Sequence, residues 1–425
     1  MRITAVGDCA IQKNLPKYYD GFDRVRDFIM QGDIRFFNME TTVCEDCFAA
    51  YYSGGTWLRT TKDVLEDVLE YGFNVTTPAN NHCMDYSYNG FLQTLDNFKA
   101  LRLQQCGGGR NMAEAAAPTY LDTPMGRAAI IGCTADYNPG AEAGEQSRDL
   151  PGRPGINPIR VQKNVYVSEE DLEKLLNITE KTKLNAFVEM ERADGYLPPA
   201  EKGVLDFEGV TFKIGHPGVS YSILDSDLQR IKRSIEDAKF QADVVLVSIH
   251  SHKMCGNNKE EPADFLIDFA HHCIDFGASA VIGHGPHLLQ PIEIYNGKPI
   301  FYSLGDFILQ LENCRILPDE YYKQYGLTPE AGIYQVFKTR TKEFKVGLQY
   351  QPKMMESVIP LIDFEDGKLH CIDLLPIELG CGKKHSQIGW PRVAENMGIL
   401  ERLARMSEPF GTKILIDKGI GRIVL

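Results

Sequence analysis

Side chains that can bind metal ions or move protons follow several short apolar runs of the chain. Two of them are carboxylates, and the others are imidazoles and one amide. They are Asp8, Glu40, Asn81, His82, His250, His252, His284 and His287. Mixed nitrogen and oxygen ligands of this kind suit zinc, manganese or iron. The set is large enough for two divalent ions, so these residues predict a dinuclear metal centre.

The apolar runs that precede these residues are typical of β-strands buried on both faces. We expect strands over residues 3–6, 34–39, 74–77, 128–133, 244–249 and 279–282. Amphipathic helices are predicted over residues 62–71, 88–101, 168–184, 224–240 and 263–276. This alternation favours a largely parallel sheet covered by helices. Ligands of such sheets lie outside the carboxyl ends of the strands, so the candidate side chains could converge there.

Each candidate side chain alone has a simpler explanation. A carboxylate after a strand often caps a turn, and a single buried histidine is usually a satisfied core residue. Here, however, five strands end in such residues at the same expected end of one sheet. That coincidence favours a metal centre over packing as the explanation for the set.

Five segments that contain these residues resemble the CapA-type family of poly-γ-glutamate capsule biosynthesis (PGA_cap), within the calcineurin-like metallophosphoesterase superfamily. The segments are GDCAI, FFNMETTV, TPANNHCMDYSYNG, VSIHSH and VIGHGPHLLQPIEIYNGKPIFYSLGDFI. The resemblance implies an α/β fold, a four-layer α/β/β/α sandwich of two sheets flanked by helices. It also implies a dinuclear site between the strand ends.

The resemblance assigns a role to each matching residue. The metal ligands that it implies are Asp8, Glu40, Asn81, His250, His284 and His287. Among them, Glu40 takes the place of the carboxylate that bridges both ions. His82 matches the histidine that assists the leaving group, and we expect Asp85 to orient it.

Two positions depart from the pattern that the resemblance implies. Ala10 stands where the superfamily usually has a histidine two residues after the first aspartate. One metal site could therefore be short of a ligand, and His252 is the candidate to complete it. The usual Ser-Leu-Gly-Asn-Phe segment has Asp306 in place of its asparagine, which adds a carboxylate near the sheet.

The C-terminal part of the chain breaks the alternation of strands and helices. We expect a metallophosphoesterase-like catalytic core over residues 1–312, followed by an insertion over 313–353. This Tyr-rich and charged segment is predicted to be a mobile lid over the metal cleft. Residues 354–425 are expected to complete the core as a C-terminal extension, with a hairpin turn at residues 365–367, a helix over 392–405 and a terminal hairpin.

The composition of the chain limits the kinds of partner that we expect it to bind. The chain has 425 residues, with 58 acidic against 45 basic ones and a formal charge of −13, so nucleic acid is not an expected partner. No apolar run approaches the roughly 18 residues of a membrane span. The first ten residues are too short an apolar segment for a signal peptide, which indicates a cytoplasmic protein. The 11 cysteines, an odd and scattered number, are expected to be reduced.

The leading hypothesis is a CapA-like, metal-dependent hydrolase of phosphoesters that activates a bridging hydroxide with two divalent ions (Mn, Fe or Zn). Its substrate would be a small-molecule phosphoester or an anionic polymer, linked to capsule or polyglutamate metabolism. One alternative is a metal-dependent amide hydrolase or transferase acting on glutamyl polymers. Another is a non-catalytic, polymer-binding partner in capsule synthesis. The sequence leaves the substrate, the metal and the oligomeric state open.

Overall fold

A large mixed sheet contains both ends of the chain. The computed structural model describes residues 1–17, 19–51, 55–207 and 209–425. The strands of this first sheet are β1 (Arg2–Ala10), β2 (Ile34–Asn38), β5 (Val75–Thr77), β6 (Gln104–Gln105), β21 (Asp306–Leu309), β22 (Glu356–Glu365), β23 (Lys368–Glu378), β24 (Arg392–Val393), β25 (Lys413–Asp417) and β26 (Ile420–Val424). Their order is β25-β26-β23-β22-β1-β2-β5-β6, with β21 beside β1 and β24 beside β23.

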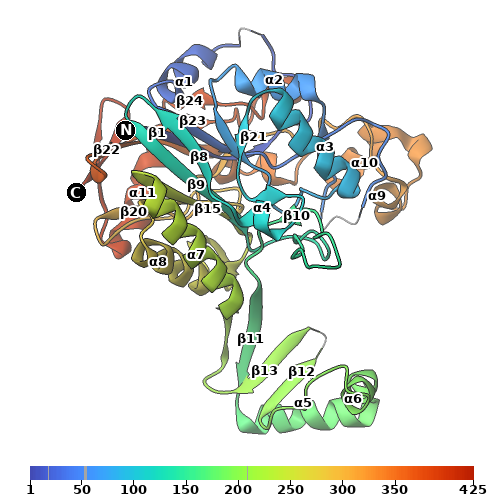
Figure 1. Cartoon of the computed structure of the whole chain (residues 1–425). Helices are drawn as coiled ribbons and strands as arrows, with labels where there is room; N and C mark the ends of the chain where they lie inside the picture. The colour runs from blue at the N-terminus through green and yellow to red at the C-terminus, as the bar shows by residue number, and fades with distance from the viewer. Residues whose placement is uncertain (18, 52–54, 208) are drawn as a thin grey trace.

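A second, six-stranded sheet faces the first (Figure 1). Its strands are β8 (Thr119–Thr123), β9 (Gly126–Thr134), β15 (Val244–His250), β18 (Ala280–His284), β19 (Ile292–Tyr295) and β20 (Lys298–Phe301). They run in the order β19-β20-β18-β15-β9-β8, and the four central strands are parallel.

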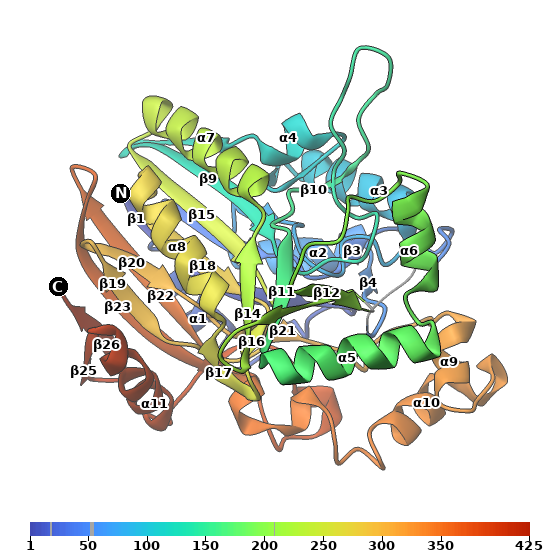
Figure 2. The same cartoon turned by 90° about the horizontal axis from the view of Figure 1, so that it is seen from below.

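Successive residues of the strands point into different hydrophobic cores. Phe36 and Ile130 lie in the core between the two sheets. Phe37 packs on the outer face of the first sheet against α1 (Phe22–Ile29), α2 (Lys62–Leu69) and α3 (Ser87–Ala100). Ile131 packs on the outer face of the second against α7 (Asp225–Gln241) and α8 (Asp264–Phe276). Because both faces of each sheet are covered, the strands are continuously apolar, and the predicted four-layer α/β/β/α fold is confirmed (Figure 2).

The C-terminal part contributes strands to the first sheet. β22 and β23 form the hairpin expected around Asp366-Gly367, and β22 pairs antiparallel with β1. The last helix, α11, begins at Gly398 and ends at Ser407, later than predicted. It begins later because Arg392–Val393 pairs with β23 as β24 instead of continuing a helix.

Residues 313–353 contain two helices, α9 (Asp319–Gln324) and α10 (Gly332–Arg340), as well as short 3-10 turns. Tyr321 and Phe337 from these helices pack with Trp57 and Tyr86 of the body in one buried cluster. The segment is therefore anchored by its own apolar side chains, and the mobility of its other parts stays a prediction.

Shorter elements complete the body. They are β3 (Thr42–Val43) paired with β4 (Arg59–Thr60), β7 (Gly108–Gly109) paired with β10 (Gly155–Ile156), β16 (Met254–Cys255) paired with β17 (Asn258–Pro262), and α4 (Met112–Ala116). In the described part of the chain, no helix has both the length and the apolar character that crossing a membrane requires.

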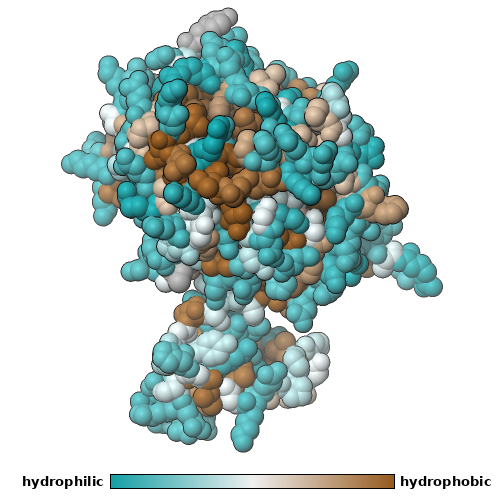
Figure 3. Space-filling view, turned by 90° about the vertical axis from the view of Figure 1, so that its left-hand side faces the viewer, coloured by the Kyte–Doolittle hydropathy of each residue, from teal (hydrophilic) through white to brown (hydrophobic). Residues whose placement is uncertain are grey.

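Residues 161–223 form an arm that projects from the body (Figure 1). It consists of a four-stranded sheet and two helices: β11 (Val161–Val167), β12 (Val204–Phe207), β13 (Val210–Ile214), β14 (Gly218–Ile223), α5 (Glu169–Thr182) and α6 (Ala186–Ala193). The expectation that residues 168–184 cover the main sheet is wrong, because α5 packs on β13 of the arm. Figure 3 shows the arm as a separate lobe with hydrophobic side chains among hydrophilic ones.

A buried ion-pair network fastens the base of the arm to the body. The carboxylate of Asp227 in α7 accepts hydrogen bonds from Arg160, directly before β11, and from Arg230 at distances of 2.6 to 2.9 Å. The Asp227 side chain is fully buried and that of Arg230 is 9% exposed. Arg230 also donates a hydrogen bond to Asn157, at 2.9 Å. Both arginines thus depend on one carboxylate.

We predict that Asp227→Ala destabilises the protein by about 3–5 kcal/mol, because it leaves buried arginine charge without its partner. The measurement is the free energy of unfolding from urea denaturation. Asp122→Ala, which removes an exposed ion pair with Arg127, is the matched control and should change stability little. Equal stability of the two variants would contradict the proposed anchoring role of the network.

Candidate metal centre

Neighbouring strands of each sheet place the candidate residues side by side. In the first sheet, Asp8 of β1 lies opposite Asn38 of β2 and Asp306 of β21. In the second sheet, His250 of β15 lies opposite His284 of β18. Because the carboxyl ends of parallel strands meet at one edge of a sheet, the facing sheets bring these side chains together.

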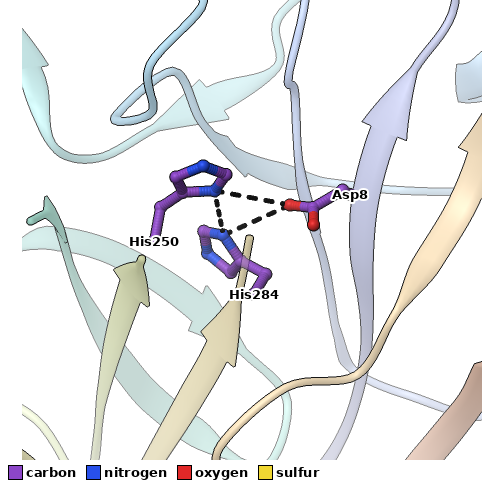
Figure 4. Close-up of side chains that lie close together, drawn as sticks. All are labelled: Asp8, His250 and His284. Atoms are coloured by element: carbon purple, nitrogen blue, oxygen red, sulfur yellow. Dashed lines mark hydrogen bonds and ion pairs between the residues drawn. The ribbon is translucent and has the colours of Figure 1, made fainter. Parts of the chain in front are cut away.

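Asp8, His250 and His284 form the first close group (Figure 4). Oδ1 of Asp8 lies 3.5 Å from Nδ1 of each histidine, and the two Nδ1 atoms are 3.0 Å apart. An ion with bonds of about 2.0–2.1 Å holds its ligand atoms roughly 3.0–3.4 Å from one another. The three atoms are thus spaced closely enough to share one ion.

A second group surrounds the other ring nitrogen of His250. Oε1 of Glu40 lies 3.6 Å from Nε2 of His250 and 3.7 Å from Nε2 of His252. Oδ1 of Asn81 lies 2.8 Å and 3.2 Å from the same two nitrogen atoms. His252, the residue expected to compensate for Ala10, therefore lies next to Glu40 and Asn81.

A third group includes Asp306, which the sequence analysis had noted only as a departure from a motif. Nδ1 of His287 lies 2.9 Å from Oδ1 of Asp306, 3.9 Å from Asp8 and 3.8 Å from Glu40. The signal for Asp306 was its motif, YSLGDF, whose strand proves to lie directly beside β1. Asp306 is thus a further candidate ligand.

The turn after β18 brings His287 into the cluster. Gly285 has φ +122°, and a Cβ atom there would lie 2.6 Å from the carbonyl oxygen of Ser251. His287 itself has φ +61°, which is uncommon for a residue with a side chain. Such backbone strain is often found at functional sites.

The polar atoms of the cluster fit a cation. Both carboxylate oxygens of Glu40 and Oδ2 of Asp306 are buried and have no hydrogen-bond partner among the described residues. A buried polar atom without a partner is costly, and a buried charge more so, unless an opposite charge or a metal ion compensates it. The buried histidine, aspartate and glutamate groups are therefore consistent with one or two metal ions.

Burial and mutual interaction shift the pKa values of these groups. Burial lowers the pKa of His250 to about 4, which keeps its imidazole neutral and able to bind a metal. Burial would raise the pKa of Asp8, but hydrogen bonds from His250 and His284 lower it well below its usual value. Burial raises the pKa of Asp306 to about 7, although the nearby His287 opposes the shift.

Residues around the cluster hold the candidate ligands in place. Asp8 accepts hydrogen bonds from the Asn38 amide at 2.7 Å and from the Gly285 backbone at 2.8 Å. Oγ of Ser248 lies 2.8 Å from Nε2 of His284, which leaves Nδ1 of that histidine facing the cluster. The sequence analysis missed Asn38 and Ser248. Their signal was a polar side chain within an otherwise apolar strand.

His82 and Asp85, the predicted catalytic pair, are in contact. Nδ1 of His82 donates a hydrogen bond to Oδ2 of Asp85, at 2.7 Å. His82, but not Asp85, lines a pocket of about 420 Å³ whose wall also includes the candidate ligands Asn81, His252 and His287. The pocket is lined by Gly55, Thr56, Asn81, His82, Asp136, Tyr137, Asn138, His252, His287, Leu311, Arg340 and Leu348.

Two facing sheets flanked by helices, with imidazoles and carboxylates at their strand ends, define an α/β/β/α protein with a candidate metal centre. Residues 2–311 match the family described as bacterial capsule synthesis protein PGA_cap, and the chain belongs to this family.

Relatives and a solved structure extend this comparison. An uncharacterized protein, y4sH, of Sinorhizobium fredii is 32% identical over all of this chain and 93% of its own length. The PGA biosynthesis protein CapA of Bacillus subtilis is 26% identical over 59% of this chain and 46% of its own. A crystal structure described as a novel phosphatase from Mycoplasma pneumoniae aligns with 89% of this chain and 93% of its own at 12% identity, with a TM-score of 0.37.

We predict that Asp8→Ala and His284→Ala each lower the bound metal by at least one ion per chain, because each removes a candidate ligand. Elemental analysis of the purified, dialysed variants measures this content. His272→Ala is the control, since that exposed ring hydrogen-bonds to the carbonyl oxygen of Asp268 and lies near Phe276, both within α8. Equal metal content in all three variants and the unmodified protein would show that the cluster is not a metal site.

Proposed function

We propose that this protein is a metal-dependent hydrolase that cleaves phosphoesters. This proposal is supported by the buried imidazoles and carboxylates that meet at the strand ends, beside a pocket that His82 also lines. Asp8, Glu40, Asn81, His250, His252, His284, His287 and Asp306 would hold the ions. When bound, two divalent ions lower the pKa of water and neutralise negative charge on a phosphoryl group.

His82 is suited to deliver the proton to the leaving group. Its Nδ1–H is held by Asp85, and Oδ2 of Asp85 also accepts a hydrogen bond from the Leu58 backbone at 2.7 Å. The backbone N–H of His82 donates to Oδ1 of Asn80, at 3.0 Å, which fixes the segment. Because Nδ1 is engaged, Nε2 is the atom of His82 that would exchange a proton with a bound substrate.

Membership of the PGA_cap family supports a second candidate function. The same centre could act on an amide bond, as a hydrolase or transferase on glutamyl polymers, because a metal centre also polarises a carbonyl group. The Bacillus subtilis relative is named a PGA biosynthesis protein. That relative is matched over less than half of its length, so the capsule role remains a proposal for this chain.

We predict that the metal-loaded protein releases phosphate from phosphomonoesters or alkyl and aryl phosphodiesters in a substrate screen. His82→Gln should lower kcat by roughly 10²–10⁴, the usual contribution of a positioned proton donor, with metal content unchanged. Asp85→Asn should show a smaller loss, because it leaves the ring in place. Cleavage of γ-glutamyl amides without release of phosphate would instead favour the amide hydrolase.

A further inference from the structure

The segment 313–353 contributes a cation to the wall of the pocket. Arg340 is the last residue of α10, and it lines the pocket together with His82, His252 and His287. Its side chain is half-buried. The helix dipole favours a cation at the C-terminal end of a helix, which explains why an arginine is stable at the end of α10. The dipole does not account for its position on the wall of this pocket.

Arg340 has no ionic partner among the residues that the structure describes. Within the described ranges, its side chain forms no ion pair and no hydrogen bond, and its guanidinium carbon lies 5.9 Å from the centre of the Phe337 ring. Other arginines with little exposure have polar partners. Arg59 pairs with Asp46, Arg230 with Asp227 and Arg402 with Glu356, and Arg35 and Arg392 donate hydrogen bonds to backbone carbonyl oxygens. In a chain of net charge −13, an unpaired guanidinium beside a pocket is an exception.

Glu312, a carboxylate whose pKa the charge of Arg340 acts to lower, already accepts a hydrogen bond from another residue. Burial raises the pKa of Glu312, and both a hydrogen bond from Tyr350 and the charge of Arg340 oppose that shift. Oε2 of Glu312 accepts a hydrogen bond from the Tyr350 hydroxyl at 3.1 Å, and Glu312 forms no ion pair with Arg340. Arg340 likewise makes no ion pair with Asp8, Glu40 or Asp306, so it is separate from the cluster.

We propose that Arg340 binds a second anionic group of the substrate, distinct from the group held at the metal cluster. The substrate class is therefore a phosphoester whose remaining part carries a carboxylate or another phosphate. A guanidinium recognises both through paired hydrogen bonds. Leu311 and Leu348 also line the pocket and offer apolar contact to the rest of the substrate. This inference rests on the proposed phosphoester hydrolase.

The test uses alkylphosphonates, which bind as phosphoesters do but are not cleaved. Binding to the metal-loaded protein is measured by titration calorimetry for propylphosphonate and for 3-phosphonopropionate, which replaces the methyl end with a carboxylate. Homologues one methylene shorter and longer allow for the distance to Arg340, and ethane-1,2-diphosphonate tests a second phosphate-like group. The ligand with the higher affinity shows whether the pocket prefers a carboxylate or a phosphate-like group as the second anion.

Arg340→Met keeps the aliphatic stem against Phe337 and removes the charge. It should weaken binding of at least one doubly anionic ligand by roughly ten- to hundredfold and leave propylphosphonate unchanged. The affinity of Arg340→Lys for that doubly anionic ligand should lie between those of the unmodified protein and of Arg340→Met. Arg315→Met, an exposed position of the same segment, is the matched control and should change neither affinity.

Each other result overturns a distinct claim. If Arg340→Met weakens all phosphonates equally, Arg340 contacts the group at the metals, and the second-anion site is wrong. If the unmodified protein shows no preference for any doubly anionic ligand, the inference fails while the phosphoester hydrolase stands. If the unmodified protein binds no phosphonate at all, the proposed function fails, and the inference fails with it.

Discussion

Three carboxylates, Asp8, Glu40 and Asp306, are buried together where the two sheets meet, and this charge must be compensated from within a water-poor site. Like charges so close raise one another's pKa and oppose burial. Burial lowers the pKa of His287, but the charges of Asp306 and Glu40 raise it to about 10, so this imidazole can supply a compensating positive charge. His287 follows β18 of the second sheet, whereas Asp8 comes from the first. Electrostatic compensation therefore ties the two sheets together. An ion that binds only the folded cluster would stabilise the whole fold by mass action.

Close approach of the backbone makes this arrangement feasible. A Cβ atom on Gly7 would lie 1.8 Å from the carbonyl oxygen of Gly305, and the next backbone N–H, that of Asp8, donates to the same oxygen at 3.1 Å. Only glycine at position 7 lets the loop before β21 pack against β1 in this way. The contact that admits Asp306 to the cluster is thus the contact that fixes the backbone of Asp8. The packing of β1 against the loop before β21 and the position of the Asp306 carboxylate thus both depend on glycine at position 7.

Continuous apolar runs and the polar residues after them are local patterns, so they predicted a sheet covered by helices and the candidate residues at the strand ends. The four-layer arrangement was predicted from the family resemblance. Asp306 and Asn38 were harder to assign, since their roles depend on which strands lie beside β1. The arm was missed for a related reason. The amphipathic pattern of residues 168–184 predicts a helix, and Ser168 does accept the capping hydrogen bond from Asp171, but it does not identify the sheet that the helix covers.

The match to the PGA_cap family covers residues 2–311, which include the cluster residues from Asp8 to Asp306 but not α10. The cluster therefore belongs to the part of the chain that defines the family, whereas Arg340 and Leu348 lie beyond it. Yet both parts line the same pocket. Under the proposed function, this division would place bond cleavage on the rigid strand ends and substrate recognition on an added segment. That segment could then change without disturbing the buried charges. Anchoring of that segment through Phe337 and Trp57 then holds the recognition wall in a defined position.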